Sequence, residues 1–113
     1  MSRDYPTGAM LRLFEEYLGQ EPPLLTRNAL AQVAYERQHQ DRKWPKQATD
    51  PNTPWLGILT EEVGEVARAT LDNAEDGPQD LRSELIQVAA VAVAWVEWLD
   101  RISLKREDDD QRQ

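Results

Sequence analysis

The segment at residues 79–103 constrains the fold most, because its apolar centre, VAAVAVAW, has to be buried. Its alanine content and its length favour a helix over a strand. Between Leu85 and Val96 only Gln87 interrupts the run of apolar residues, and a helix that is apolar on every side is buried on every side. One short chain can hardly cover such a helix, so we expect a homodimer with this helix near the subunit interface.

The first half of the chain is patterned as two helices separated by prolines. Residues 8–18 carry apolar side chains at helical spacing, and the prolines at 22–23 end that segment. A second helix is expected to begin after Thr26 and to end near Trp44, because the residue before a proline is pushed out of the α region. Residues 45–54 are then a loop.

A third helix has a clear start signal in Thr53, a good N-cap, followed by Pro54 at the first helical position. It is expected to end near residues 71–73, and the sequence EDGP at 75–78 breaks the chain before the last helix. The predicted fold class is therefore all-α, as a small bundle of about four helices. The expected parts are an N-terminal extension with a short amphipathic helix (1–24), a helical domain (25–103) and a charged, disordered tail (104–113).

The charge balance and the lack of cysteine exclude several classes of partner and site. A net charge of −8 disfavours a nucleic-acid backbone or an anionic membrane as the partner of the surface as a whole. Without cysteine the chain has neither disulfides nor thiolate zinc sites. The N-terminus has no apolar core of signal-peptide length, and the longest apolar run is too short for a membrane span. We therefore expect a cytoplasmic protein that binds neither nucleic acid nor membrane.

The segment ILTEEVGEVARA, residues 58–69, places three glutamates beside an apolar helix face. With Glu61 at zero on a helical wheel, Glu65 lies at about 40° and Glu62 at about 100°, while the apolar side chains spread from about 60° to about 220°. Carboxylates at the border of a core are costly to ionise without cations. One divalent cation satisfies several carboxylates, and oxygen ligands suit Mg²⁺ or Mn²⁺. A solvated helix face with i,i+4 pairs is the alternative.

The last helix offers matching polar groups, because Glu84 and Gln87 lie together at one end of its apolar stripe. A short connection favours antiparallel packing, which would let these two residues face Glu62 and Glu65. The four would then form a cluster of oxygen ligands inside a helical bundle. Alternatively, Glu84 is an acidic residue favoured in the first turns of a helix, and Gln87 is a hydrogen-bonded core glutamine.

These two motifs resemble the signature of the MazG-like, all-α nucleoside triphosphate pyrophosphohydrolases, whose relatives include phosphoribosyl-ATP pyrophosphatases and dimeric dUTPases. That family carries E-x-x-E on one helix and E-x-x-D on the next. Here the first half is EVGE, from Glu62 to Glu65, preceded by Glu61. The second half is ELIQ, from Glu84 to Gln87.

The resemblance implies a dimer or tetramer of MazG-like chains, a reaction and a cofactor. Water would attack an NTP or dNTP between the α- and β-phosphates, which yields a nucleoside monophosphate and pyrophosphate. Glu62, Glu65 and Glu84 would hold Mg²⁺, or Mn²⁺ in its place, on the triphosphate. Gln87 would be the remaining ligand of the motif, and Glu61 would hold a further Mg²⁺ or orient the attacking water. The metal would neutralise phosphate oxygens and lower the pKa of bound water.

The resemblance covers residues 25–103 and departs from the family at position 87, where the chain has Gln and the family has Asp. A carboxamide oxygen can ligate a metal but brings no charge, so we expect weaker Mg²⁺ affinity, a different number of metals or lost activity. The alternative function is therefore a non-catalytic helical oligomer that binds nucleotide, metal or a protein partner. A structural adaptor that docks a partner through its N-terminal helix is a third hypothesis.

Two further segments are expected to contact the nucleotide. Trp44 would stack on the base, and His39 or Lys43 would touch the ligand. Arg101 and Lys105 would contact phosphates from the end of the last helix. A surface histidine is the alternative for His39. The other tryptophans, at positions 55, 95 and 98, are expected in the core. The sequence selects neither a base nor a sugar.

Overall fold

The computed structural model of the chain describes residue 16, residues 23–71 and residues 73–112, except for the side chains of residues 73–79. Over this part of the chain there are three helices and no strand: α2 (Leu24–Lys43), α3 (Trp55–Leu71) and α4 (Asn73–Arg112). The prediction of an all-α fold is confirmed. The helix predicted at residues 8–18 lies outside the described residues, apart from Glu16, which is helical.

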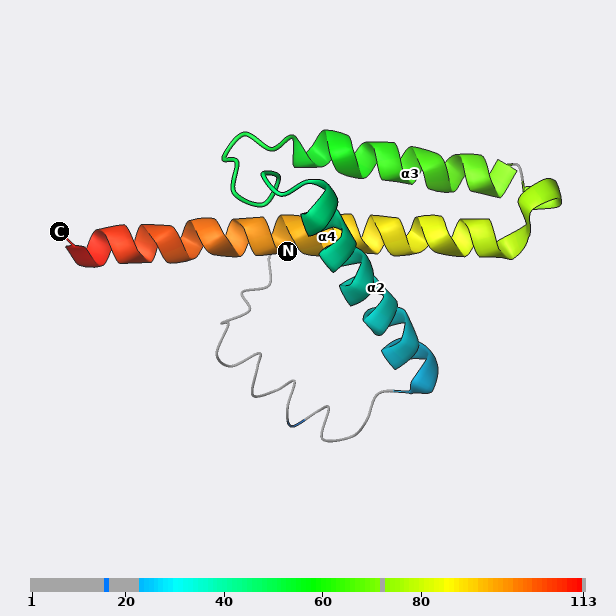
Figure 1. Cartoon of the computed structure of the whole chain (residues 1–113), viewed down its shortest axis with the longest axis horizontal. Coiled ribbons are helices and arrows are strands. Elements are labelled where there is room, and N and C mark those ends of the chain that lie inside the picture. The colour runs from blue at the N-terminus through cyan, green and yellow to red at the C-terminus, as the bar shows by residue number, and fades with distance from the viewer. Residues whose placement is uncertain (1–15, 17–22, 72, 113) are drawn as a thin grey trace, which may run out of the picture.

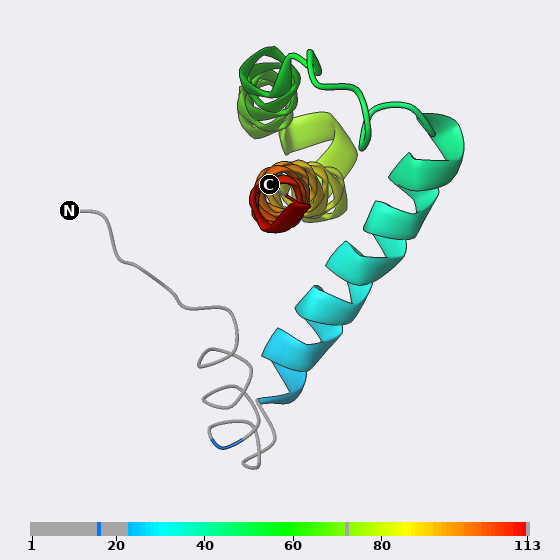
Figure 2. The same cartoon turned by 90° about the vertical axis from the view of Figure 1, so that its left-hand side faces the viewer.

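α4 is the central element, and the other two helices pack on it from different sides (Figure 1 and Figure 2). α3 runs antiparallel along the N-terminal half of α4, because a single residue separates the two helices. α2 crosses α4 obliquely, with a hydrogen bond from Arg82 to Gln32 near one end of the crossing and a contact to Glu97 near the other. Within the described residues, α2 and α3 contact α4 but not each other.

The core is small and lies where the start of α3 meets α4. Trp55, Val91 and Ala94 are buried together. The rings of Trp55 and Trp98 meet edge to face with centroids 6.4 Å apart, a favourable arrangement for two aromatic rings. Partly buried side chains pack against this core: Ile58, Leu59, Trp95 and Trp98. The three tryptophans that the sequence assigns to the core therefore lie in it or against it.

A buried arginine fastens α2 to α4. Arg37 is only 7% exposed, and its guanidinium donates from Nε and Nη2 to the two carboxylate oxygens of Glu97, each at 3.0 Å. Nη2 also donates to Asp41, and Nη1 donates to the side-chain oxygen of Gln40 at 3.1 Å. The hydrogen bond from Arg37 lowers the pKa of Glu97, although partial burial acts in the other direction. The buried positive charge is thus paired with a carboxylate in the two-pronged geometry that arginine favours.

The ends of α2 and α3 lie close to the predicted positions. α2 begins at Leu24, earlier than the expected start after Thr26, because the carbonyl of Pro23 already accepts the first helical hydrogen bond. α3 begins at Trp55, directly after the start signal at residues 53–54. The loop between these helices therefore occupies the range that the prolines predict.

α4 is longer than predicted at both ends. The sequence predicts a break at 75–78 and a helix over 79–103, whereas the structure is helical from Asn73 to Arg112. Pro78 removes only one donor from the helical ladder, and its neighbours stay helical. The tail that the sequence predicts to be frayed is helical instead. No glycine or proline follows residue 78, and Arg112 forms an ion pair with Asp108, one turn earlier, at 3.3 Å. None of the described helices is both long enough and apolar enough to cross a membrane.

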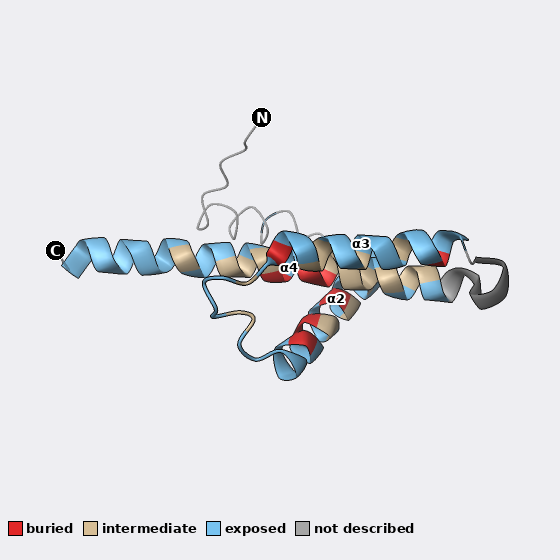
Figure 3. Ribbon diagram, turned by 90° about the horizontal axis from the view of Figure 1, so that it is seen from above, coloured by how far each residue is buried: buried red, intermediate tan, exposed pale blue. Residues whose placement is uncertain are grey.

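Much of α4 is exposed or only half-buried (Figure 3), and its exposed positions include large apolar side chains. The side chains of Leu85, Val96 and Leu99 are 50%, 56% and 49% exposed. No large side chain among the described residues is fully buried. The radius of gyration is 17.0 Å, whereas a compact chain of this length has about 13 Å. The described part of the chain therefore leaves the apolar centre of α4 only partly covered, as the sequence predicts.

Candidate functional site

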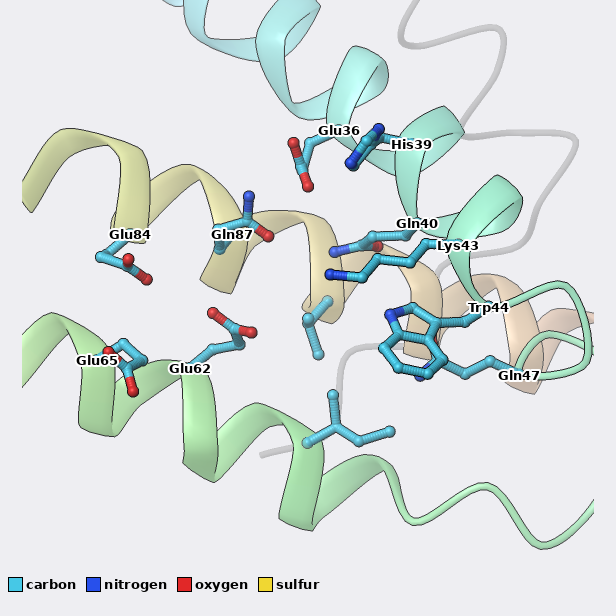
Figure 4. Close-up of a pocket in the computed structure, with 12 residues that line it drawn as sticks. Glu36, His39, Gln40, Lys43, Trp44, Gln47, Glu62, Glu65, Glu84 and Gln87 are labelled. Atoms are coloured by element: carbon cyan, nitrogen blue, oxygen red, sulfur yellow. The ribbon is translucent and has the colours of Figure 1, made fainter. Parts of the chain in front are cut away.

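A pocket of about 420 Å³ opens between α2, α3 and the N-terminal half of α4 (Figure 4). Its volume lies within the range of small-molecule sites in proteins, about 300–1,000 Å³. α3 and α4 contribute an acidic wall, and α2 contributes a wall of mixed polar and aromatic side chains. Ile58 and Val91 add apolar surface to the same pocket. It therefore combines a charged part with a part that suits an uncharged ring.

The acidic wall consists of Glu62 and Glu65 from α3 with Glu84 and Gln87 from α4. Each pair is spaced three residues apart, so both members lie on the same face of their helix. The antiparallel packing of α3 on α4 places the two faces opposite each other across the pocket (Figure 4). The structure thus brings together the four residues to which the sequence assigns a metal.

The carboxylates of this wall are poorly compensated. Burial raises the pKa of Glu62, and the neighbouring negative charges of Glu84 and Glu65 raise it further. Burial also raises the pKa of Glu84, again with a contribution from Glu65. Glu65 has an ion pair with Arg68 at 3.8 Å, in which both side chains are exposed. None of the ion pairs found in the described residues involves Glu62 or Glu84, so a bound cation would relieve their repulsion.

The donor set of this wall fits a hard divalent cation in its chemistry, since every donor is an oxygen. Its present arrangement is open. Among the described residues, no three His, Cys, Asp or Glu side chains form a group that could hold a metal ion. Binding a cation here would therefore require Glu62, Glu65 and Glu84 to turn toward one another on helices that already face each other.

The opposite wall is the last two turns of α2. His39, Lys43 and Trp44, which the sequence assigns to the nucleotide, all line the pocket. α2 ends here because Pro45 follows, and the N–H of Trp44 closes the helix by donating to the carbonyl of Gln40 at 2.8 Å. The amino group of Lys43 lies 5.6 Å from the centre of the Trp44 ring, within reach of a cation–π interaction.

Sequence reasoning missed three polar residues of the pocket: Glu36, Gln40 and Gln47. The first two share a face of α2 with His39 and Lys43, at the helical spacing i, i+3, i+4 and i+7. This polar face was detectable from the spacing once the two predicted residues were assigned to the pocket. The negative charge of Glu36 also acts on the acidic wall, because it contributes to the raised pKa of Glu62.

Three predicted site residues lie elsewhere. Glu61 is exposed on α3 and does not line the pocket, although its charge contributes to the raised pKa of the adjacent Glu62. Arg101 and Lys105 line a separate hollow beside the loop that precedes α3. Arg101 donates there to the carbonyl of Ala48 at 3.3 Å. α4 continues straight past the crossing with α2, which carries both cations beyond the pocket.

No protein-family model, curated protein or solved structure matches the chain. Its likeness to MazG-like proteins therefore rests on the two four-residue motifs and on the residues around them.

Proposed function

We propose that the chain is a MazG-like nucleotide pyrophosphohydrolase that depends on a divalent metal and cleaves an NTP or dNTP between the α- and β-phosphates. The observation that carries the proposal is the shared pocket of Glu62, Glu65, Glu84 and Gln87, two residues from each of two antiparallel helices. Carboxylates with raised pKa values and without cationic partners are costly in a purely structural role. A divalent cation gives them a function and explains how a chain of charge −8 would bind an anion.

The two walls divide the work in this proposal. Glu62, Glu65 and Glu84 would hold Mg²⁺ or Mn²⁺, with Gln87 as a neutral oxygen donor. The cation, when bound, would neutralise phosphate oxygens and lower the pKa of a coordinated water. On the opposite wall Trp44 offers a flat aromatic face on which a base can stack. Glu61, the predicted catalytic group, lies outside the pocket next to Glu62, so it would have to turn toward the pocket to hold a further Mg²⁺ or to orient the attacking water.

We also propose that the functional unit is a homodimer, or a tetramer built from dimers, with α4 at the interface. Leu85, Ala92, Val96 and Leu99 follow one another at steps of seven, four and three, which places them on one face of the helix. All except alanine are large apolar side chains about half exposed in the single chain. A second copy of the same stripe would cover them with the same chemistry.

A second candidate function is a non-catalytic helical oligomer that binds nucleotide, metal or a protein partner. The observation that favours it is Gln87, which faces the pocket where the motif of the family has a carboxylate. The loss of one negative charge weakens the attraction for a divalent cation, so ligand binding could persist after turnover has ceased.

The deciding experiment is pyrophosphate release from a panel of canonical and modified NTPs and dNTPs, with Mg²⁺ and with Mn²⁺. Glu62→Gln removes a pocket carboxylate, Gln87→Asp restores the charge of the family motif, and Glu107→Gln is a matched control on an exposed part of α4. Release by the wild type and by Glu107→Gln, but not by Glu62→Gln, supports the hydrolase. Release by Gln87→Asp alone supports the binding protein. If no variant releases pyrophosphate and metal does not stabilise the protein, both the hydrolase and the binding protein are contradicted, and a structural adaptor is left.

A further inference from the structure

Gln40 is a buried glutamine whose amide has a fixed orientation. It is 8% exposed, and it lines the pocket from α2. Its side-chain oxygen accepts a hydrogen bond from Nη1 of Arg37 at 3.1 Å. A guanidinium has only donors, so the atom of Gln40 that faces Arg37 has to be the oxygen and not the nitrogen. The amide NH₂ group is therefore forced to the other side.

That other side is the pocket. The amide nitrogen of Gln40 points into the cavity in Figure 4, and no described residue accepts a hydrogen bond from it. Lys43 lies one turn further along the same helix face and also directs its amino group to the cavity (Figure 4). An ammonium group has donors and no acceptor. The α2 wall thus presents two neighbouring groups that can only donate.

A ligand that fills the pocket has to offer an acceptor to the buried amide of Gln40, because a buried donor without a partner is costly, and the exposed Lys43 adds a second donor beside it. The cation and the phosphates belong at the acidic wall, on the far side of the cavity. The region between Gln40, Trp44 and the apolar side chains of Ile58 and Val91 is left for the uncharged ring of the nucleotide. The edge of the base, rather than the phosphate chain, would then face the two donors.

We propose that Gln40 is a specificity-determining residue that, together with Lys43, selects bases with two adjacent hydrogen-bond acceptors. Cytosine offers such a pair in N3 and O2, and guanine in N7 and O6. Uracil carries a hydrogen on N3, and adenine has an amino group where guanine has O6. The substrate class is therefore cytosine or guanine nucleotides, and this assignment rests on the proposed nucleotide-binding function of the same pocket.

Arg37 has the role of a positioning residue in this proposal. It is held by Glu97 and Asp41, and it in turn holds the oxygen of Gln40. Without the guanidinium the amide is free to rotate by half a turn and to present its oxygen to the base. Arg37→Met is therefore expected to reduce the preference between bases. A general loss of stability would leave the ratio of kcat/KM between two bases unchanged at a temperature where the variant stays folded.

The test compares matched nucleotides on the full chain and on two variants of Gln40. Gln40→Glu keeps the shape of the side chain but presents an acceptor, and Gln40→Met removes the polar group. Gln38→Glu, at an exposed position of the same helix, controls for the added charge. The measured quantities are kcat/KM for pyrophosphate release and, for the α,β-methylene analogues with Mg²⁺, the Kd by calorimetry. The pairs are dCTP against dUTP and dGTP against dATP, and melting temperatures show which variants fold.

The wild type and Gln38→Glu should favour dCTP over dUTP, or dGTP over dATP, by about fivefold to 150-fold, which is the range for one good two-point base contact. Gln40→Glu should abolish or reverse that ratio, and Gln40→Met should abolish it without reversal. Pyrophosphate release with an unchanged ratio in both Gln40 variants, or without a preference in the wild type, overturns the base assignment and leaves the hydrolase intact. If no nucleotide is cleaved and no analogue binds, the proposed function and the base assignment fall together.

Discussion

Glu97→Gln should weaken the attachment of α2 to α4 and lower the free energy of unfolding by about 2 kcal/mol. The wild-type carboxylate accepts two charged hydrogen bonds from Arg37, each 3.0 Å long. Breaking a buried ion pair from one side costs about 3–5 kcal/mol, and a hydrogen bond to a charged group contributes about 1.5–3 kcal/mol. We take the lower part of this range because the side chain of Glu97 is 38% exposed and because Asp41 still pairs with Arg37 in the variant.

The assay is thermal and urea unfolding followed by circular dichroism at pH 7 and at one fixed protein concentration. An unfolding entropy of about 2.1 cal/mol/K per residue converts 2 kcal/mol into a drop of about 8 °C in Tm for 113 residues. Glu107→Gln, an exposed glutamate of the same helix, is the control. If the two variants differ by less than about 0.5 kcal/mol, the pair does not anchor α2, and the reasoning is refuted.

The pH dependence gives the same prediction an independent check. Because Arg37 lowers the pKa of Glu97 in the folded protein, the stabilisation is complete above the pKa of about 4.5 in the unfolded chain. It is lost as the pH falls through the lower pKa of the folded state. The difference between the wild type and Glu97→Gln should therefore be constant near neutrality and shrink below about pH 4.5.

Three further predictions concern the acidic wall and the exposed stripe. In EDTA at pH 7, Glu62→Gln should raise the free energy of unfolding by about 0.5 kcal/mol relative to the wild type, because it removes a partly buried charge and its repulsion by Glu84 and Glu65. Because the pKa of Glu62 is raised in the folded protein, protonation of this carboxylate favours the folded state as the pH falls. The difference in stability between Glu62→Gln and the wild type should therefore shrink as the pH falls from 7 toward 4.5. A difference that does not change with pH would contradict the charge of Glu62 as its cause. Millimolar Mg²⁺ should raise the Tm of the wild type, and the stabilisation should be about 2.7 kcal/mol when the Mg²⁺ concentration is a hundred times the Kd. An equal rise in the Tm of Glu62→Gln would show that the metal binds elsewhere. If the proposed homodimer forms through this stripe, Val96→Glu should convert it to a monomer in sedimentation equilibrium, and an unchanged dimer mass would show that the interface lies elsewhere.

The sequence predicted the acidic wall because both of its halves are local patterns. Glu62 with Glu65 and Glu84 with Gln87 are each spaced to share a helix face, and the short connection expected between the two helices favours antiparallel packing. Residues 79–103 indicated the all-α class for a similar reason, since their composition alone favours a long helix.

The position of α2 was not predictable in the same way. It depends on Arg37 and Glu97, which are sixty residues apart in the chain, and no local spacing shows that their side chains meet. Glu36 and Gln40 share a helix face with His39 and Lys43, so their omission follows from not extending that local spacing and not from the position of α2. Arg101 was assigned to the nucleotide because a cation near a phosphate site is chemically plausible, but the straight course of α4 carries it to a different hollow.

The arrangement of two arms on one central helix has a consequence for the order of folding. α3 and α4 can pair from their shared turn, whereas α2 contacts α4 through Arg37 and Glu97, which are sixty residues apart in the chain. The Arg37–Glu97 contact should therefore form after the transition state, so that Glu97→Gln speeds unfolding and changes the refolding rate little in stopped-flow measurements. A refolding rate slowed in proportion to the lost stability would show the opposite order. In this order of folding the hairpin of α3 and α4 forms the acidic wall first, and α2 adds the opposite wall of the pocket in the last step.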